Sequence, residues 1–136
     1  MEGISISRVA DAAGVNLQTV RYYEREGLLP PAPRTAANYR AFPPESVRRI
    51  RFIKRAQELG FTLQEIRELM ALTPEAGDDC ATVRALAKEK VSQIKAKVAS
   101  LNRMRRTLER LIRECPGEGG TLDRCPILGA FDGEDL

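Results

Sequence analysis

Residues 5–27 read SISRVADAAGVNLQTVRYYEREG and decide the fold class. Ser5 is a suitable N-cap for a helix whose apolar residues recur at helical spacing, and Gly14 can adopt the left-handed conformation that ends it. Asn16 is a suitable N-cap for a second helix over residues 17–26. Two short helices joined by a tight turn predict a helix-turn-helix, in which polar side chains near the start of the second helix can reach DNA bases.

Two further helices are predicted after this motif. Residues 28–44 contain five prolines and no helical period, so we expect a loop there, with one strand of a β-hairpin wing at residues 38–42. A third helix is expected over residues 45–59. A fourth follows the capping box that Thr62 and Glu65 can form. These elements complete a small helical domain.

The longest predicted helix covers residues 80–114, a stretch without proline or glycine. Its apolar heptad positions are Ala87, Ile94, Leu101 and Leu108, with a second series at Val91, Val98 and Ile112. A helix of this length extends about 50 Å, farther than the rest of a small domain is wide. No other segment is long enough to cover its stripe, so we expect two chains to pair as a homodimer.

Composition excludes several classes of protein. The 136 residues are 43% hydrophobic, but no apolar run approaches the length of a membrane span, and the first residues lack a signal-peptide pattern. We therefore expect a cytoplasmic protein with no membrane partner. The sequence has no His, which removes imidazole catalysis and His-ligated metals. No carboxylate pair, phosphate loop or activated nucleophile stands out, so we do not expect an enzyme.

The excess positive charge lies in the first half of the chain. Residues 1–72 contain 11 basic and 8 acidic residues, whereas residues 73–136 contain 11 of each. Five basic residues lie within an eight-residue stretch of the third predicted helix: Arg48, Arg49, Arg51, Lys54 and Arg55. Such a cluster is commonly a solvated helix face, but beside a helix-turn-helix it favours a nucleic-acid partner.

Three cysteines lie at the ends of the long helix and just beyond it: Cys80, Cys115 and Cys125. A free cysteine is most often a small buried apolar residue, but none of these lies on an apolar helix face. Within one chain, Cys80 and Cys115 would be about 50 Å apart and could not bind one ion. In an antiparallel dimer, Cys80 of one subunit would meet Cys115 and Cys125 of the other, which predicts a site with three thiolates.

Three sulfur ligands without nitrogen favour a thiophilic ion. Mercury(II) and lead(II) are the ions for which three thiolates suffice, and cadmium(II) is the next most suitable ion. Structural zinc sites are usually four-coordinate, and iron–sulfur clusters commonly need four cysteines. Two alternatives from other classes remain. A disulfide between Cys115 and Cys125 would make a thiol-redox switch but leave Cys80 without a role, and a coiled-coil adaptor would use its cysteines only for packing.

Several motifs resemble the DNA-binding domain of the MerR family. They are VRYYE at residues 20–24, GLLP at 27–30, NYR at 38–40, RFI at 51–53 and LGFTL at 59–63. The long helix resembles the family's antiparallel dimerisation helix, and the three cysteines fall where its mercury sensors carry their ligands. The resemblance implies a mainly helical, all-α fold in three segments. These are a winged helix-turn-helix domain over residues 1–73, a coiled-coil dimerisation helix over 80–114, and a metal-binding loop with a C-terminal tail over 115–136.

The resemblance also implies a mechanism. A dimer would bind between promoter elements that are spaced too far apart for RNA polymerase, and would repress without metal. Mercury(II) binding would untwist and bend the double-stranded DNA and so activate transcription. The implied DNA contacts are Thr19, Arg21 and Tyr22 in the recognition helix, Tyr39 and Arg40 in the wing, and Arg55 on the third helix. Lead(II) and cadmium(II) sensors of the family also use three cysteines, so these ions remain alternative effectors.

Overall fold

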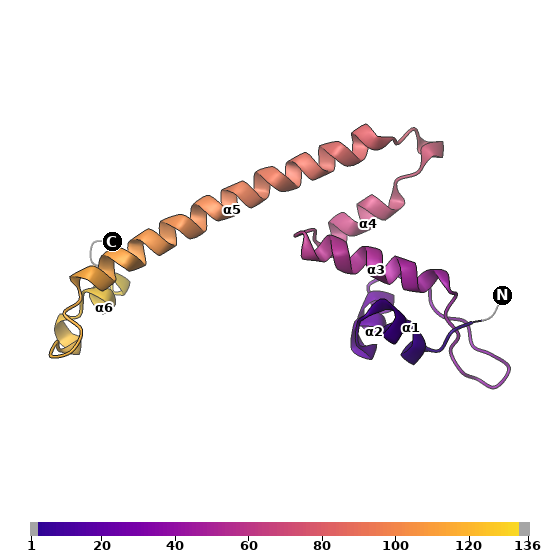
Figure 1. The fold of residues 1–136 in the computed structure, drawn as a ribbon, viewed down its shortest axis with the longest axis horizontal. Coiled ribbons are helices and arrows are strands. Elements are labelled where there is room, and N and C mark those ends of the chain that lie inside the picture. Colours follow the sequence, from indigo (N-terminus) through magenta and orange to yellow (C-terminus); the bar gives the residue numbers. More distant parts are fainter. Residues whose placement is uncertain (1–2, 134–136) are drawn as a thin grey trace. The chain divides into compact units, whose positions relative to one another are not determined.

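The computed structural model describes residues 3–133. Residues 1–2 and 134–136, which belong to the first and third predicted segments, lie outside the described residues. Within the described part, the α-helices are α1 (Ile6–Ala13), α2 (Leu17–Arg25), α3 (Glu45–Glu58), α4 (Leu63–Ala71), α5 (Cys80–Glu114) and α6 (Pro126–Phe131) (Figure 1). Short 3₁₀ turns lie at Pro74–Ala76 and Leu122–Arg124. The chain divides into two compact units, Met1–Arg84 and Ala85–Leu136. The predicted all-α class is confirmed.

The caps predicted around the first turn are present. The Ser5 hydroxyl accepts a hydrogen bond from the backbone N–H of Arg8, and Gly14 is left-handed with φ 73°. Asn16 Oδ1 accepts the backbone N–H of Thr19 at 2.8 Å. Because each short helix ends or begins at a satisfied cap, α2 starts within four residues of the end of α1.

One apolar core joins the helices of the first unit. Its fully buried members are Val9, Val20, Leu28, Leu29, Phe42, Ile50, Ile53 and Ile66. Helix α1 packs on α2 and on α3, and α4 packs on α3. Tyr23 is also buried, and its hydroxyl donates to Gln57 Oε1 at 2.6 Å, so the core tyrosine has a polar partner. The buried residues of α2 and α3 therefore form the inward faces of these helices.

Two isolated antiparallel bridges replace the strand expected at residues 38–42: Ile4 with Phe42, and Arg34 with Arg40. A hairpin is still formed, because the Thr35 N–H donates to the Tyr39 carbonyl at 2.7 Å and Asn38 reverses the chain with φ 67°. The prolines on either side cannot donate to a ladder, so pairing does not extend into a regular strand. The wing is thus a short hairpin loop.

The second unit consists of most of α5 and the segment after it. The stripe residues Val91, Ile94, Val98, Leu101, Leu108 and Ile112 are 42% to 62% exposed in the single chain. After α5 the chain turns back (Figure 1). Leu111 of α5 and Ala130 of α6 are both buried, as expected if α6 packs on the end of α5. The sequence led us to expect only a loop and tail here, whereas Pro126 starts a short helix.

No helix within residues 3–133 has the combined length and apolarity that a bilayer crossing requires.

Replacing Asn16 with alanine should lower the free energy of unfolding by about 1 kcal/mol, because α2 loses its N-cap. Asn16→Asp keeps a side-chain acceptor and should unfold near the wild-type denaturant midpoint. Chemical denaturation of the full chain, followed by circular dichroism, measures both variants. Equal losses in the two variants would mean that the cap does not stabilise α2.

Candidate functional site

Helix α2 presents the predicted base-reading side chains to solvent. Arg21 is exposed and Tyr22 is 41% exposed, whereas Val20 and Tyr23 on the opposite face are buried. Tyr22 has a partner that was not predicted: the Arg25 guanidinium lies 5.9 Å from the centre of its ring. Residues three apart in a helix are neighbours, so this pair could have been found from spacing.

Thr19 is less available than predicted. It is half-buried, and its hydroxyl donates to Asn16 Oδ1 at 2.9 Å. The Thr19 N–H donates to the same oxygen at 2.8 Å, so a phosphate contact through the hydroxyl would need its proton to turn away from Asn16. The phosphate contact expected of Thr19 stays a prediction.

The two wing residues differ in their surroundings. Tyr39 lies in the hairpin and is 73% exposed. Arg40 instead forms an ion pair with Glu24 of α2, and its guanidinium lies 5.3 Å from the centre of the Phe42 ring. Glu24 also accepts the backbone N–H of Ala32 at 2.9 Å. This carboxylate, which the sequence did not single out, attaches the wing to the recognition helix.

The environment of Glu24 changes its acidity. Burial alone would raise the pKa of this carboxyl group, because it disfavours the charged form. The hydrogen bonds from Arg40 and from the Ala32 N–H, together with the charge of Arg40, outweigh burial and leave the pKa below its usual value. The ionised carboxylate is therefore the form that holds the wing.

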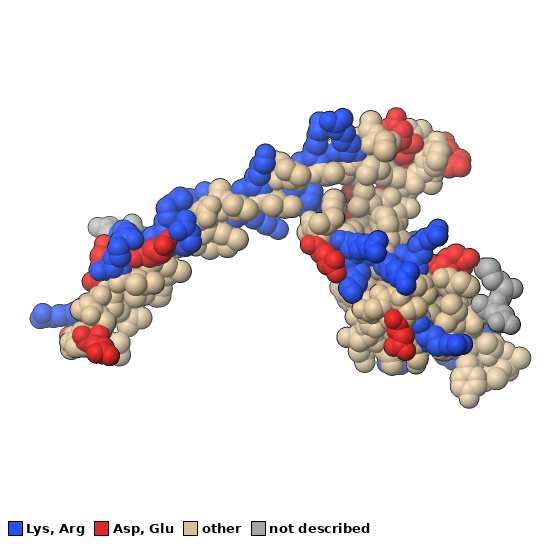
Figure 2. All heavy atoms as spheres, viewed as in Figure 1, with Lys and Arg blue, Asp and Glu red and all other residues tan. Residues whose placement is uncertain are grey.

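The basic cluster of α3 has two roles. Arg51 Nη2 donates to the Ala12 carbonyl at 2.6 Å, Lys54 Nζ to the Gly14 carbonyl at 3.0 Å, and Arg49 Nε to the Leu28 carbonyl at 2.7 Å. Arg48 and Arg55 are exposed and line, with Phe52, a surface hollow of about 520 Å³. Figure 2 shows Lys and Arg side chains gathered over this helix. Arg51 and Lys54 thus bind the end of α1 and Arg49 binds the loop after α2, whereas Arg55 is exposed.

The three cysteines occupy the predicted positions around α5. Cys80 is its first residue and is exposed, whereas Cys115 and Cys125 are half-buried, and all three thiols are free. Asp79 Oδ1 caps the helix by accepting the backbone N–H groups of Ala81 at 3.0 Å and Thr82 at 3.3 Å. Over residues 3–133 of one chain, no group of three or more Cys, Asp or Glu side chains is arranged to hold a metal ion. With no His in the sequence, the cysteine thiolates are the soft donors that carry negative charge.

Proteins of similar sequence include the mercuric resistance operon regulatory protein of Bacillus cereus, which is 41% identical over 123 residues, 90% of this chain and 92% of that protein. A transcription regulator of Ralstonia metallidurans CH34, solved in complex with lead(II), has a TM-score of 0.80 at 34% identity and covers 94% of this chain and 98% of its own. The dual function regulator MerR of Bacillus megaterium MB1, solved with mercury(II), has a TM-score of 0.66 at 34% identity, with coverages of 95% and 99%.

Glu24→Gln should remove one source of acid sensitivity. Because the pKa of Glu24 is lower in the folded state than in the unfolded state, its stabilisation is complete above the unfolded pKa and is lost as pH falls through the folded pKa. Between about pH 6 and about pH 3, the wild-type Tm should fall more than that of Glu24→Gln. Glu58→Gln, a change at an exposed carboxylate on α3, is the matched control. A Tm decrease of equal size in Glu24→Gln and wild type would contradict this assignment.

Two family models match this chain. The model for MerR HTH family regulatory proteins covers residues 4–73, and the model for MerR, DNA binding, covers residues 47–111. The first spans the four helices of the first unit, including both helices of the predicted helix-turn-helix. Since this match covers more than half of the sequence, the chain belongs to the MerR family of helix-turn-helix transcription regulators.

Proposed function

We propose that this protein is a heavy-metal-responsive regulator that acts as a homodimer on double-stranded promoter DNA, with mercury(II) as its effector. The observation that carries the proposal is the placement of three free thiols at the two ends of one 35-residue helix and just beyond it. A site made from these thiols needs a second chain, because the helix rises about 50 Å between its ends.

The exposed stripe on α5 supports pairing of two chains. Val91, Ile94, Val98 and Leu101 are each 42% to 62% exposed, and burying them against a second α5 would remove a continuous apolar surface from water. An antiparallel arrangement brings the start of each α5 to the end of its partner. Cys80 of one subunit then faces Cys115 and Cys125 of the other, and bound metal cross-links the two chains.

The donor set supports a thiophilic effector. Three thiolates suit mercury(II), with lead(II) and cadmium(II) as alternatives of the same class. Similar proteins also support a thiophilic effector. The Bacillus cereus protein is a mercuric resistance regulator, and the two similar solved structures hold lead(II) or mercury(II). We propose mercury(II) because the curated relative and one of these structures agree on it.

The proposed DNA contacts come from exposed and half-buried polar residues of the first unit. Arg21 and Tyr22 would contact bases, whereas Thr19 and Arg55 would contact phosphates, and the wing would add Tyr39 and Arg40. Without metal, the dimer would hold a promoter whose elements are too far apart for RNA polymerase. Metal would favour a second conformation of the same dimer, in which the DNA is untwisted and bent into a usable register.

Mixing two defective chains should restore one metal site. Neither Cys80→Ser nor the double variant Cys115→Ser/Cys125→Ser can bind mercury(II) through three thiolates as a homodimer. In a heterodimer of the two, Cys80 of the second chain meets Cys115 and Cys125 of the first, so one intact site forms. Titration of the mixed, reduced proteins with mercury(II) under excess small thiol, followed by thiolate-to-metal absorption, measures the recovery.

The outcomes separate the alternatives. If the mixture does not recover mercury(II) binding, either the ligands lie within one chain or the cysteines serve only for packing. Thiol-resistant binding of lead(II) or cadmium(II), with none of mercury(II), would change the ion and leave the intersubunit site in place. A Cys125→Ser variant that loses its response to oxidant while keeping full metal affinity would indicate the redox switch.

Phosphate and base contacts should respond differently to mutation. Arg55→Ala should weaken binding to all duplexes alike and lower the slope of log K against log salt concentration by about 1. Arg21→Ala should instead cost roughly tenfold or more for the preferred duplex and little for a scrambled one. Fluorescence anisotropy over a salt series gives both quantities. A selective loss in Arg55→Ala, or a uniform one in Arg21→Ala, would reverse the two roles.

A further inference from the structure

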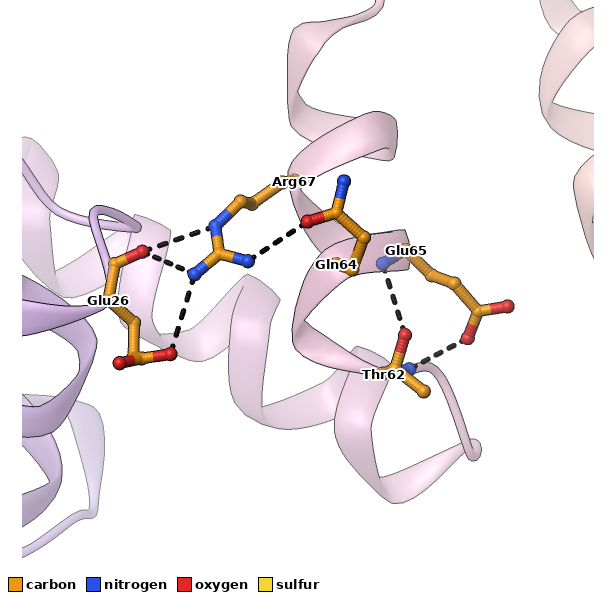
Figure 3. Close-up of polar contacts among 5 residues, drawn as sticks. All are labelled: Glu26, Thr62, Gln64, Glu65 and Arg67. Carbon is orange, nitrogen blue, oxygen red and sulfur yellow. Dashed lines mark hydrogen bonds and ion pairs between the residues drawn. The ribbon is translucent and has the colours of Figure 1, made fainter.

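A side chain of α4 holds the C-terminal end of the recognition helix α2. Arg67 donates from Nε to the Glu26 carbonyl at 3.1 Å, and its Nη2 donates to the same oxygen. Nη2 also lies 3.6 Å from the Glu26 carboxylate, and Nη1 donates to Gln64 Oε1 at 3.1 Å (Figure 3). All three nitrogens of the guanidinium are therefore directed at protein acceptors.

The contact satisfies an acceptor at the end of a helix. Glu26 is the C-cap residue of α2, so its carbonyl lies beyond the last intrahelical hydrogen bonds. A cation at this end also interacts favourably with the negative pole of the helix dipole. A planar guanidinium can present two N–H groups to one oxygen, which limits both the distance and the angle of approach.

The backbone from which Arg67 extends is itself well anchored. Thr62 and Glu65 form a capping box at the start of α4, with hydrogen bonds of 2.8 and 3.1 Å (Figure 3). The adjacent Ile66 is fully buried in the core. Since α4 packs on α3, Arg67 adds a directional polar link from α4 to α2. This link lies one helical turn beyond the exposed Arg21 and Tyr22.

We propose that Arg67 is a positioning residue for DNA recognition, which sets the angle of α2 by holding the Glu26 carbonyl. Arg67 touches no base in this role and acts through Arg21 and Tyr22. The inference rests on the DNA-binding part of the proposed function and not on the identity of the metal. The competing role is a direct phosphate contact, because the Arg67 side chain is 36% exposed.

Salt dependence separates the two roles. A phosphate contact contributes about 0.9 to the slope of log K against log salt concentration, whereas a contact within the protein contributes nothing. The probe is the duplex that the wild-type full-length chain enriches most from a random-sequence pool, and the comparison duplex is its scrambled version. Arg67→Ala should lower the ratio of the two affinities roughly tenfold, the effect of weakening one base contact, and leave the slope unchanged.

Two control variants isolate the carbonyl contact. Glu26→Gln removes the ion pair but keeps the carbonyl, so its affinity ratio should stay within about twofold of wild type, as expected for an exposed pair. Arg106→Ala on α5 removes the same charge from an exposed position and should leave the ratio unchanged. A loss in Glu26→Gln equal to that in Arg67→Ala would assign the effect to the ion pair and overturn the proposal.

Arg67→Lys keeps the charge but replaces the planar guanidinium with a compact ammonium whose three N–H groups rotate freely, so it should recover part of the ratio lost in Arg67→Ala. This variant also serves if Arg67→Ala does not fold. Three results would each overturn the proposal: a full wild-type ratio in Arg67→Lys, an unchanged ratio in folded Arg67→Ala, or a slope smaller by about 1 in Arg67→Ala. Failure of the DNA-binding function is distinguishable, since the wild-type chain would then enrich no duplex.

Discussion

The uninterrupted length of α5 is the constraint on which the proposed mechanism depends. Thirty-five residues without proline or glycine form one helix from Cys80 to Glu114. At about 1.5 Å per residue its ends are about 50 Å apart, so thiols at the two ends cannot share an ion within one chain. The same length gives the helix an apolar stripe that its own chain leaves exposed. A three-thiolate site therefore requires the proposed dimer, and bound metal would cross-link its two chains.

In the DNA-binding unit, cations do more than attract phosphate. Arg51 and Lys54 bind carbonyls at the end of α1, and Arg49 and Arg67 bind carbonyls at or just after the end of α2. Arg51, Lys54 and Arg67 satisfy acceptors at the ends of helices and place positive charge at their negative poles, whereas Arg49 binds the loop that follows α2. The net charge of the sequence therefore overstates what is available to DNA. The number of basic residues predicts a nucleic-acid partner. Only the geometry separates the basic side chains that are available to DNA from those that bind backbone carbonyls within the protein.

Local signals explain what the sequence could predict. The caps at Ser5, Asn16 and Thr62 involve residues three apart, and the heptads of α5 repeat along one element, so spacing alone reveals them. The contacts of Lys54 with Gly14 and of Arg67 with Glu26 join residues 40 and 41 apart, and nothing in one sequence distinguishes these cations from solvated ones. Helix α6 has six residues, too few for a period to emerge. The cysteines could be assigned to helix ends because helix boundaries are locally coded, whereas their proposed convergence would be a property of two chains.

The recognition helix is held by two kinds of interaction, and they control different properties. Burial of Val20 and Tyr23 stabilises the unit, but apolar contact is non-directional and tolerates small rotations of a helix about its axis. The polar contacts at the end of α2 are directional: Glu24 binds the wing through Arg40 and Ala32, and Glu26 binds α4 through Arg67. Hydrogen bonds to base edges weaken steeply when donor and acceptor are misaligned. Stability of this unit should therefore follow its core, whereas discrimination between DNA sequences should follow the polar contacts that orient α2.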